Sequence, residues 1–164
     1  MTSTLPKVSH EHHERLSRHV DRMPAVGDLI GTVPVAELAP AVHEMTSFLT
    51  DLLIPHMEAS ERALYPELER MLQNRHSMTP MRREHTEIRG LIEDLAKRGK
   101  NLDAGHLTVG DAVALRRVIF RLYAILKVHL AEEQLYLGII EHDVSPEVGE
   151  TLASAMEHAG TQEF

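Results

Sequence analysis

Apolar residues recur every three to four positions along most of the chain, and no segment shows the alternation of β-branched residues that is typical of a strand. This spacing places the apolar side chains of each segment on one face of a helix. The pattern therefore predicts an all-helical protein. The first predicted helix covers residues 8–23 and stops at Pro24, because the proline ring cannot continue a helix.

Two further stretches are marked mainly by their prolines. Residues 24–34 contain two Pro and two Gly with little periodicity, so we predict that they form a connection. Residues 36–72 keep one apolar face, although Pro40, Pro55 and Pro66 interrupt it. We predict one long, kinked helix here, or two collinear pieces.

The second half of the chain carries clear start and stop signals for helices. Thr79, with a proline directly after it, is a good cap, and the apolar pattern that follows runs to a basic turn and a stop at Gly99. Thr108 and Asp111 form a capping-box pattern. It opens the longest periodic run of the chain, which reaches Ile140 and predicts a fourth long helix.

Four long helices joined by short connections favour antiparallel neighbours. We therefore predict an up-down-up-down four-helix bundle, followed by a short fifth helix that begins at Ser145 and ends near Met156. The chain 1–164 is predicted to be a single domain, with the bundle at about 8–142 and a C-terminal appendage at 145–164. The core of such a bundle is a common place for a metal site.

Composition narrows the classes of function. The chain has 17 Lys and Arg against 25 Asp and Glu, and its net charge of −8 repels nucleic acid and anionic lipid. The absence of Cys excludes disulfides, thiolate ligands and cysteine nucleophiles, and is ordinary in reducing cytoplasm. The sequence shows neither an export signal nor 18 consecutive apolar residues. We therefore expect a cytoplasmic protein that binds neither nucleic acid nor a membrane.

Histidine is unusually frequent, with twelve residues beside three Phe, three Tyr and no Trp. Each histidine can be tested against the apolar face of its own predicted helix, because residues advance by about 100° per position. Glu133 lies one turn beyond His129, so the two side chains project from the same face. The histidines that lie on such a face, one for each long helix, are His13, His56, His85 and His129.

Burying these groups without partners would cost roughly 1–3 kcal/mol for each imidazole, and more for the carboxylate. A metal cation would satisfy all of them together. The ligand set is rich in nitrogen, includes a carboxylate and lacks sulfur, so it suits iron, manganese or zinc. In a helical bundle, histidine and carboxylate ligands most often hold a pair of non-haem irons. The competing interpretation is that these are ordinary polar positions at the ends of the bundle.

The other histidines fit the inward faces less well. His12 and His19 flank the apolar face of the first helix, and either could replace His13. The remaining six are expected in solvent, in loops or on outer faces: His10, His43, His76, His106, His142 and His158.

With these residues the chain resembles the hemerythrin-like HHE cation-binding family over residues 12–140. The family pattern is His on the first helix, His-x-x-x-Glu on the second, His on the third and His-x-x-x-Glu on the fourth. The resemblance implies a four-helix bundle that holds non-haem iron, as a di-iron centre with an oxo or hydroxo bridge, or alternatively zinc or manganese. The residues that match the pattern are His13, His56, His85, and His129 with Glu133.

The second helix departs from the family pattern. Four residues after His56, where the family has a carboxylate that bridges the two irons, this chain has Ser60. Glu61 is the next residue, but it lies about 140° from His56 around a regular helix and needs a local distortion to take that place. Tyr65, Tyr136, a water molecule or an oxo group are the alternatives.

The third helix departs as well. Arg89 stands where the oxygen carriers of the family have a second histidine, one turn after His85. A cation beside iron is unfavourable, so we expect Arg89 to pair with a carboxylate at the edge of the site. Fewer imidazoles leave open positions on the metal, which favours reaction with peroxide, oxygen or nitric oxide over simple oxygen storage.

The resulting hypothesis is a metal site made of His13, His56, Glu61, His85, His129 and Glu133. The resemblance implies that the site binds or reacts with O2, peroxide or NO in a redox-stress role. It also suggests catalase- or peroxidase-like turnover, which no residue distinguishes from sensing. The alternative is a degenerate bundle with one or no metal, acting as a sensor or partner-binding module. Signatures of ferritin-like oxidases, zinc proteases, serine hydrolases and nucleotide-binding proteins are absent from the sequence.

Overall fold

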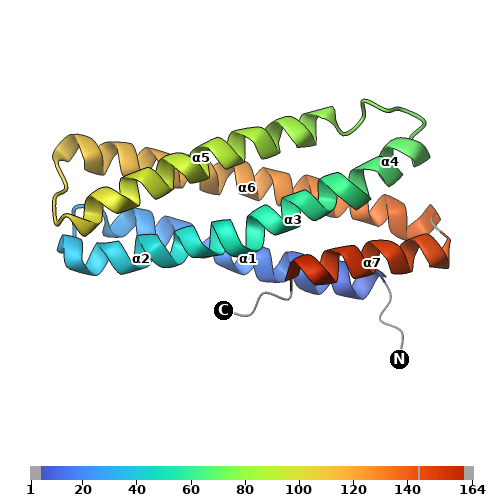
Figure 1. The fold of residues 1–164 in the computed structure, drawn as a ribbon, viewed down its shortest axis with the longest axis horizontal. Helices are drawn as coiled ribbons and strands as arrows, with labels where there is room; N and C mark the ends of the chain where they lie inside the picture. Colours follow the sequence, from blue (N-terminus) through green and yellow to red (C-terminus); the bar gives the residue numbers. More distant parts are fainter. Residues whose placement is uncertain (1–4, 144, 161–164) are drawn as a thin grey trace.

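The computed structural model describes residues 5–143 and 145–160, and within these residues all regular structure is helical. Three uninterrupted helices, α1 (Leu5–Leu29), α5 (Thr79–Asp103) and α6 (Val109–Asp143), run along the long axis of the molecule. A segmented helical rod from Val35 to Met71 completes a four-helix bundle (Figure 1). The all-α bundle predicted from the periodicity is confirmed.

The segmented rod is the long, interrupted helix predicted around its prolines. It consists of α2 (Val35–Phe48), the π-helical turn η1 (Leu49–Leu53), α3 (Ile54–Ala59), a second π-helical turn η2 (Ser60–Leu64) and α4 (Tyr65–Met71). Pro55 and Pro66 each lie in the first turn of the α-helix that follows a π turn. Because proline cannot donate a backbone hydrogen bond, the widened turn allows the helix to continue through it.

The π turn η2 changes which residues face the inside of the bundle. In a regular α-helix, Tyr65 would lie about 180° around the axis from His56, nine residues earlier. A π turn absorbs one extra residue, which reduces that angle to about 80°. Tyr65 is fully buried as a result, whereas Glu61, at the start of η2, is partly exposed.

The predicted end of the first helix at Pro24 is wrong, because α1 continues through this residue to Leu29. The apolar face also continues, with Ile30 buried beyond the proline. The guanidinium of Arg116 on α6 donates hydrogen bonds to the carbonyls of Gly27 (3.3 Å) and Ile30 (2.7 Å). Contacts with α6 therefore hold the last turns of α1 and outweigh the local cost of the proline.

The stop predicted at Gly99 is also wrong. α5 passes through Gly99, which is buried beside α2, and a Cβ atom there would lie at an ordinary contact distance of 3.7 Å from Val42. The helix ends instead before Gly105, whose φ of +74° is the left-handed conformation that terminates helices. At its start, Thr79 is the first helical residue rather than the cap, which is Met78.

The capping box predicted for the fourth helix is confirmed. The Asp111 N–H donates to Thr108 Oγ1 (3.1 Å), and the Thr108 N–H donates to Asp111 Oδ2 (3.2 Å). The fifth helix, α7 (Pro146–Gly160), is longer than predicted and lies along α1 and α3, where Leu152 is buried (Figure 1). α7 therefore covers one end of the bundle.

The buried apolar side chains form two clusters rather than one. On α5, Ile88 belongs to the first cluster and Met81 to the second, and on α6 the same division separates Leu130 from Leu137. At or near the boundary between the two clusters lie the buried polar and charged residues of the described part of the chain. They are His12, His13, His56, Ser60, His85, His129 and Glu133. A polar layer thus separates two apolar regions of the bundle.

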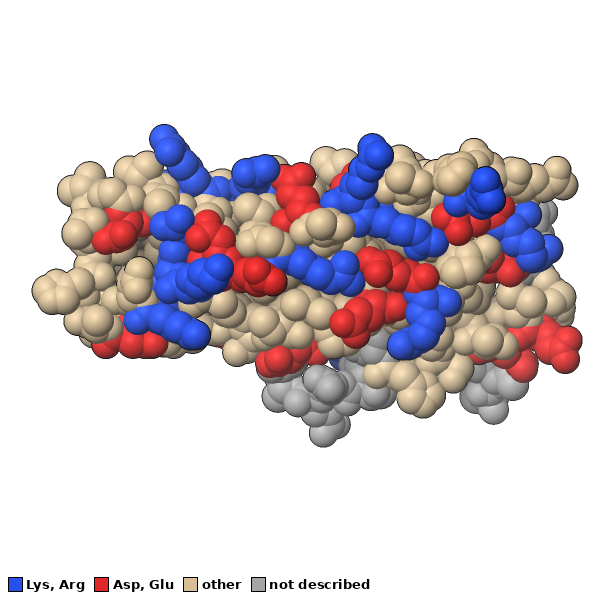
Figure 2. All heavy atoms as spheres, turned by 45° about the horizontal axis from the view of Figure 1, so that its top comes forward, with Lys and Arg blue, Asp and Glu red and all other residues tan. Residues whose placement is uncertain are grey.

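The surface carries charges of both signs. Lys and Arg alternate with Asp and Glu across the face shown in Figure 2, and the described residues there form no continuous basic strip of the kind that nucleic-acid binding uses. No helix within the described part of the chain is long and apolar enough to cross a lipid bilayer.

Candidate metal centre

The polar layer is built from residues of every helix of the bundle. His13 comes from α1, His56 from α3, His85 from α5, and His129 and Glu133 from α6. All five side chains are buried, as their position on the apolar faces predicts. The structure therefore brings together the four histidines and the carboxylate that the sequence pattern selects.

One half of the layer is centred on a single carboxylate oxygen. Glu133 Oε2 lies 2.9 Å from His13 Nε2 and 2.7 Å from His56 Nε2. The ligand atoms of His13, His56 and Glu133 all lie within 4.8 Å of one another, which is a spacing that a metal ion can bridge. We call these three residues the first half-site.

The other half pairs two imidazoles with a phenol. His85 Nε2 lies 3.0 Å from His129 Nε2 and 3.1 Å from the Tyr65 hydroxyl. The same hydroxyl donates to Glu133 Oε1 at 3.2 Å. Glu133 therefore directs one oxygen to each half of the layer. We call His85, His129 and Tyr65 the second half-site.

Carboxylates lie behind both histidines of the second half-site. His85 Nδ1 donates to Glu61 Oε1 (2.6 Å), which also accepts a hydrogen bond from Arg89 (3.0 Å). His129 Nδ1 donates to Glu84 Oε2 (2.8 Å). The expected pairing of Arg89 with a carboxylate at the edge of the site is confirmed. Because carboxylates accept these bonds, each Nδ1 carries a proton and each Nε2 is left as a potential ligand atom.

The histidines of the first half-site have neutral partners behind them. His13 Nδ1 lies 3.0 Å from Gln134 Oε1, and His56 Nδ1 lies 3.0 Å from His12 Nε2. His12 and His13 are thus both buried, although the sequence pattern of the first helix presents them as alternatives. The roles of His12 and Gln134 depend on contacts between helices, which the face pattern of one helix does not contain.

The environment sets the charge of these groups before any metal is present. Burial opposes ionisation of Glu133, but attraction to His56 and His13 holds the pKa of this carboxyl well below its usual value. Burial also opposes protonation of His13, yet its hydrogen bond to Glu133 raises the pKa of this imidazole. Burial lowers the pKa of His56. An anionic carboxylate is therefore held between imidazoles of different proton affinity.

Other groups of the layer stay neutral. Burial, aided by the neighbouring imidazole of His129, lowers the pKa of His85 to about 4. Burial, aided by His56, lowers the pKa of His12 to about 3. Burial and the negative charge of Glu133 raise the pKa of the Tyr65 hydroxyl. These two histidines and the phenol are uncharged near neutral pH.

The second half-site contains a contact between two ring nitrogens that a bound cation would make favourable. Since Glu61 and Glu84 accept the Nδ1 protons, the inner nitrogens of His85 and His129 face each other across 3.0 Å, and without a proton or a cation between them two lone pairs oppose each other. The single hydroxyl proton of Tyr65 cannot satisfy both. A proton on His85 is disfavoured by its lowered pKa. The donor set therefore fits a metal ion.

The remaining candidate residues have different surroundings. Ser60 is fully buried, and its Oγ has no hydrogen-bond partner, which is unusual for a buried hydroxyl. Glu61 contacts the outer nitrogen of His85 rather than the inner ligand atoms. Tyr136 packs against the second apolar cluster. Tyr65 is the alternative oxygen donor that the structure brings to the inner ligand atoms.

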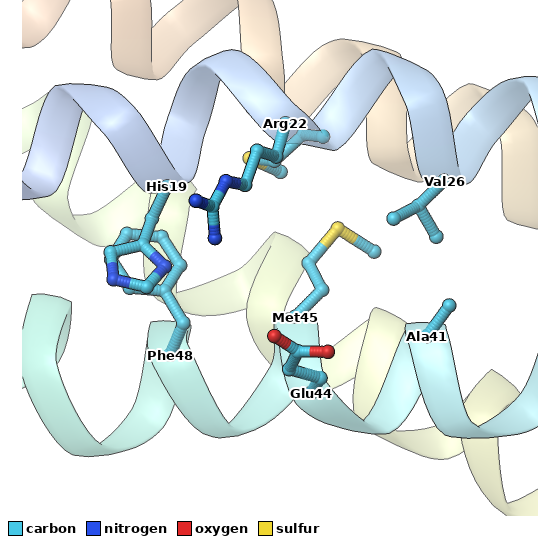
Figure 3. Close-up of a pocket in the computed structure, with 8 residues that line it drawn as sticks. His19, Arg22, Val26, Ala41, Glu44, Met45 and Phe48 are labelled. Atoms are coloured by element: carbon cyan, nitrogen blue, oxygen red, sulfur yellow. The ribbon is translucent and has the colours of Figure 1, made fainter. Parts of the chain in front are cut away.

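His19 lies outside the polar layer. Its ring stacks on Phe48, with centroids 4.5 Å apart, in a pocket between α1 and α2 that Arg22 and Glu44 also line (Figure 3). The expectation of exposure is confirmed for His10, His43, His76, His106 and His158, whereas the side chain of His142 lies outside the described residues.

A four-helix bundle with four imidazoles and a carboxylate buried between its helices defines a metal-binding helical protein. The chain belongs to the hemerythrin family: the model of the hemerythrin HHE cation binding domain matches residues 5–154, nearly the whole chain. The resemblance seen in the sequence is confirmed, and binding of metal cations follows from it together with the His13–His56–Glu133 group. Comparison with curated proteins and with solved structures gives no match.

Proposed function

We propose that this protein binds two non-haem iron ions in the polar layer and uses them to bind or react with O2, peroxide or NO. The main support for the proposal is that His85 Nε2 and His129 Nε2 face each other at 3.0 Å. The carboxylate of Glu133, next to them, contacts a second pair of imidazoles, those of His13 and His56. Two sets of inward donors that share Glu133 are a suitable arrangement for two neighbouring ions.

Each ion would have its own set of ligands. His13, His56 and Oε2 of Glu133 would hold one ion. His85, His129, the Tyr65 oxygen and Oε1 of Glu133 would hold the other. Bound iron supplies electron transfer to a small oxidant or ligand. In this arrangement Tyr65 takes the part of the missing carboxylate at Ser60, and Glu61 orients His85.

The residues around the layer support this chemistry. The two apolar clusters on either side of it exclude bulk water, which strengthens electrostatic contacts inside. Glu84 and Glu61 fix the rotation of His129 and His85, so that Nε2 faces inward. The mixture of imidazole, carboxylate and phenol oxygen, without sulfur, suits iron, with manganese or zinc as the competing metals.

A second candidate function is favoured by Ser60. The buried Ser60 offers no carboxylate that could bridge two ions. The neighbouring Glu61 contacts Arg89 and the outer nitrogen of His85 instead. Under this alternative, the bundle holds one ion or none and acts as a sensor or partner-binding module. Metal content separates the two functions.

The test is metal analysis with an ultraviolet-visible spectrum, on protein produced in iron-supplemented medium. We expect close to two irons per chain and charge-transfer absorption that changes when peroxide is added. The variant His129→Ala should lose iron, while the exposed control His76→Ala should match the wild type. One ion per chain, or zinc in place of iron, would favour the second function. A metal-free protein that cannot be loaded would contradict metal-based chemistry altogether.

A further inference from the structure

The outward face of α6 carries an unusual number of exposed apolar side chains. Within the described part of the chain, seven large apolar side chains are exposed, and six of them belong to α6. They include Leu135, which is 73% exposed, and Val128, which is 55% exposed. The opposite side of α6 packs against α1 and α5 (Figure 1) and carries His129 and Glu133 of the polar layer. A helix that is apolar on both sides is typical of one that is covered on both sides.

The exposed apolar residues form a narrow stripe along the axis of α6. They follow one another at spacings of 4, 4, 3, 4 and 4 residues, which is a period close to that of the α-helix itself. At about 100° per residue, they all fall within an arc of about 100°. Arg117 lies on the same face and ends the stripe on its N-terminal side. We call this set the α6 stripe: Phe120, Ala124, Val128, Ala131, Leu135 and Ile139.

The edges of the α6 stripe carry ion pairs within the chain. On one edge Lys127 is paired with Asp21 of α1 at 2.9 Å, and on the other Arg121 is paired with Glu87 of α5 at 2.8 Å. An apolar centre with a polar rim is the usual composition of a protein–protein interface. The two ion pairs are neutral, so they add no like-charge repulsion between two copies of a chain whose net charge is −8.

The order of large and small residues along the stripe fits a second copy of the same stripe in the antiparallel direction. With a two-fold axis near residues 129–130, Ala124 of one copy faces Leu135 of the other, and Val128 faces Ala131. A large side chain opposite a small one lets two helices approach closely. In a parallel pair each residue would face its own copy, so that leucine would meet leucine and alanine would meet alanine. The stripe is therefore self-complementary in the antiparallel direction.

The size of the stripe sets the expected strength of the contact. Nineteen residues of rise separate Phe120 from Ile139, which is about 29 Å of helix. With a width of about 10 Å, the apolar centre covers about 300 Å² on each copy. Specific interfaces bury about 600–1,000 Å² per partner, so the rims on α1 and α5 supply the remainder. We expect a dimer at the small end of this range, with a dissociation constant on the order of micromolar.

We propose that the α6 stripe is the contact surface of a homodimer, in which two copies of the chain pair their α6 helices in antiparallel directions about a two-fold axis beside Val128 and Ala131. The occupant is a second copy because the stripe is complementary to itself. This inference goes beyond the proposed function and does not depend on it, since the stripe lies on the side of α6 that faces away from His129 and Glu133.

The first test is sedimentation equilibrium of the full chain at about 1–300 μM, which brackets a micromolar dissociation constant. The wild type should approach twice the 18.5 kDa of one chain. Leu135→Glu should weaken the dimer at least about 100-fold, because the interface would bury two carboxylates without partners. Leu72→Glu changes an exposed leucine outside the stripe and is the matched control. Circular dichroism and metal content should match the wild type in both variants.

The second test reads the direction of the two helices. The chain has no cysteine, so introduced thiols report only on the designed positions. On mild oxidation, a mixture of Ala124→Cys and Leu135→Cys should form a disulfide between chains roughly tenfold faster than either protein alone, because pairing raises the local thiol concentration. Two copies of Ala124→Cys would be about 16 Å apart along the helix in the antiparallel pair, too far for a disulfide.

The expected result is a dimer that Leu135→Glu abolishes and Leu72→Glu retains, with the mixed cross-link. A wild type that stays at 18.5 kDa up to the highest concentration would overturn the proposal, and binding of this monomer to phospholipid vesicles would assign the stripe to a membrane surface instead. A dimer that persists in Leu135→Glu would place the contact elsewhere. Rapid cross-linking of Ala124→Cys with itself would show a parallel pair and overturn the antiparallel arrangement.

Discussion

Glu84 and His85 are consecutive residues of α5, and both contact the ring of His129 on α6, from opposite sides: His85 Nε2 faces His129 Nε2 at 3.0 Å, while Glu84 accepts the outer N–H of His129 at 2.8 Å. Adjacent residues on a helix point about 100° apart. His85 can therefore enter the core, while Glu84 contacts the outer nitrogen of His129 on the neighbouring helix. The α5–α6 pair therefore holds His129 from both sides.

Metal should stabilise the fold strongly. A ligand that binds only the native state, at 100 times its dissociation constant, adds about 2.7 kcal/mol per site to the free energy of unfolding. We expect Zn²⁺ to raise the melting temperature of the metal-free wild type, and to raise that of His129→Ala much less. The exposed His76→Ala variant should respond like the wild type. An equal shift in all three proteins would show that zinc acts elsewhere.

The metal-free protein should lose stability as the pH falls from 6.5 towards 4. His12 and His85 have pKa values lowered to about 3 and about 4 by burial, so in this range they are neutral in the fold and protonated in the unfolded chain. Stability from such groups is present above pH 6.5 and is lost by up to about 1.4 kcal/mol per pH unit for each histidine.

Other groups of the layer modify this pH profile. His13, whose pKa is raised by Glu133, contributes stability below pH 6.5 and opposes part of the loss. Glu133, whose pKa is lowered by His56 and His13 against the effect of burial, contributes above pH 4.5 and loses its contribution only at lower pH. Urea denaturation at several pH values measures the sum. His12→Gln should flatten the slope, and an unchanged slope would remove His12 from this explanation.

Tyr65→Phe should affect both the metal-free and the iron-loaded protein. The substitution leaves Glu133 Oε1 and His85 Nε2 without their shared hydroxyl partner, which should cost about 1–3 kcal/mol of stability. With ferric iron bound, it should also remove the visible absorption that a phenolate ligand provides. Tyr136→Phe is the matched control, since Tyr136 packs in the second apolar cluster. Identical spectra for Tyr65→Phe and the wild type would exclude Tyr65 as a ligand.

Pro24→Ala should stabilise the protein. Pro24 lies inside α1, where it lacks the N–H for one helical hydrogen bond, and an interior proline costs about 3 kcal/mol relative to alanine. Because proline also restricts the unfolded chain, part of this gain is offset by up to about 1 kcal/mol. The net increase should be about 2–3 kcal/mol in urea denaturation, with no change in metal content. A decrease would mean that the proline ring at position 24 is needed for packing of α1.

Much of the architecture was predictable from local patterns. The spacing of apolar residues predicts the four long helices, and the same spacing selects four inward histidines and Glu133, which the structure buries together. The capping box at Thr108 is likewise local, because both hydrogen bonds join residues three positions apart. Such features depend on the periodicity of a single helix.

The ends of helices were less predictable from the sequence where contacts with other helices extend them. Pro24 and Gly99 are strong local stop signals, but α1 and α5 continue through them. Hydrogen bonds from Arg116 hold the end of α1, and Gly99 is buried in the contact between α5 and Val42 of α2. In both cases the gain in tertiary contacts exceeds the local cost.

The sequence by itself determined the helical class, the inward histidines and the family. Only the tertiary structure decided that Tyr65 rather than Glu61 reaches the inner ligand atoms, and that Gln134 and Glu84 stand behind different half-sites. The physical reason is that helix periodicity is a local property, whereas contacts across the bundle depend on the rotation of each helix about its axis. The π turn before Tyr65 changes that rotation by one residue, and packing against the neighbouring helices sets the rest.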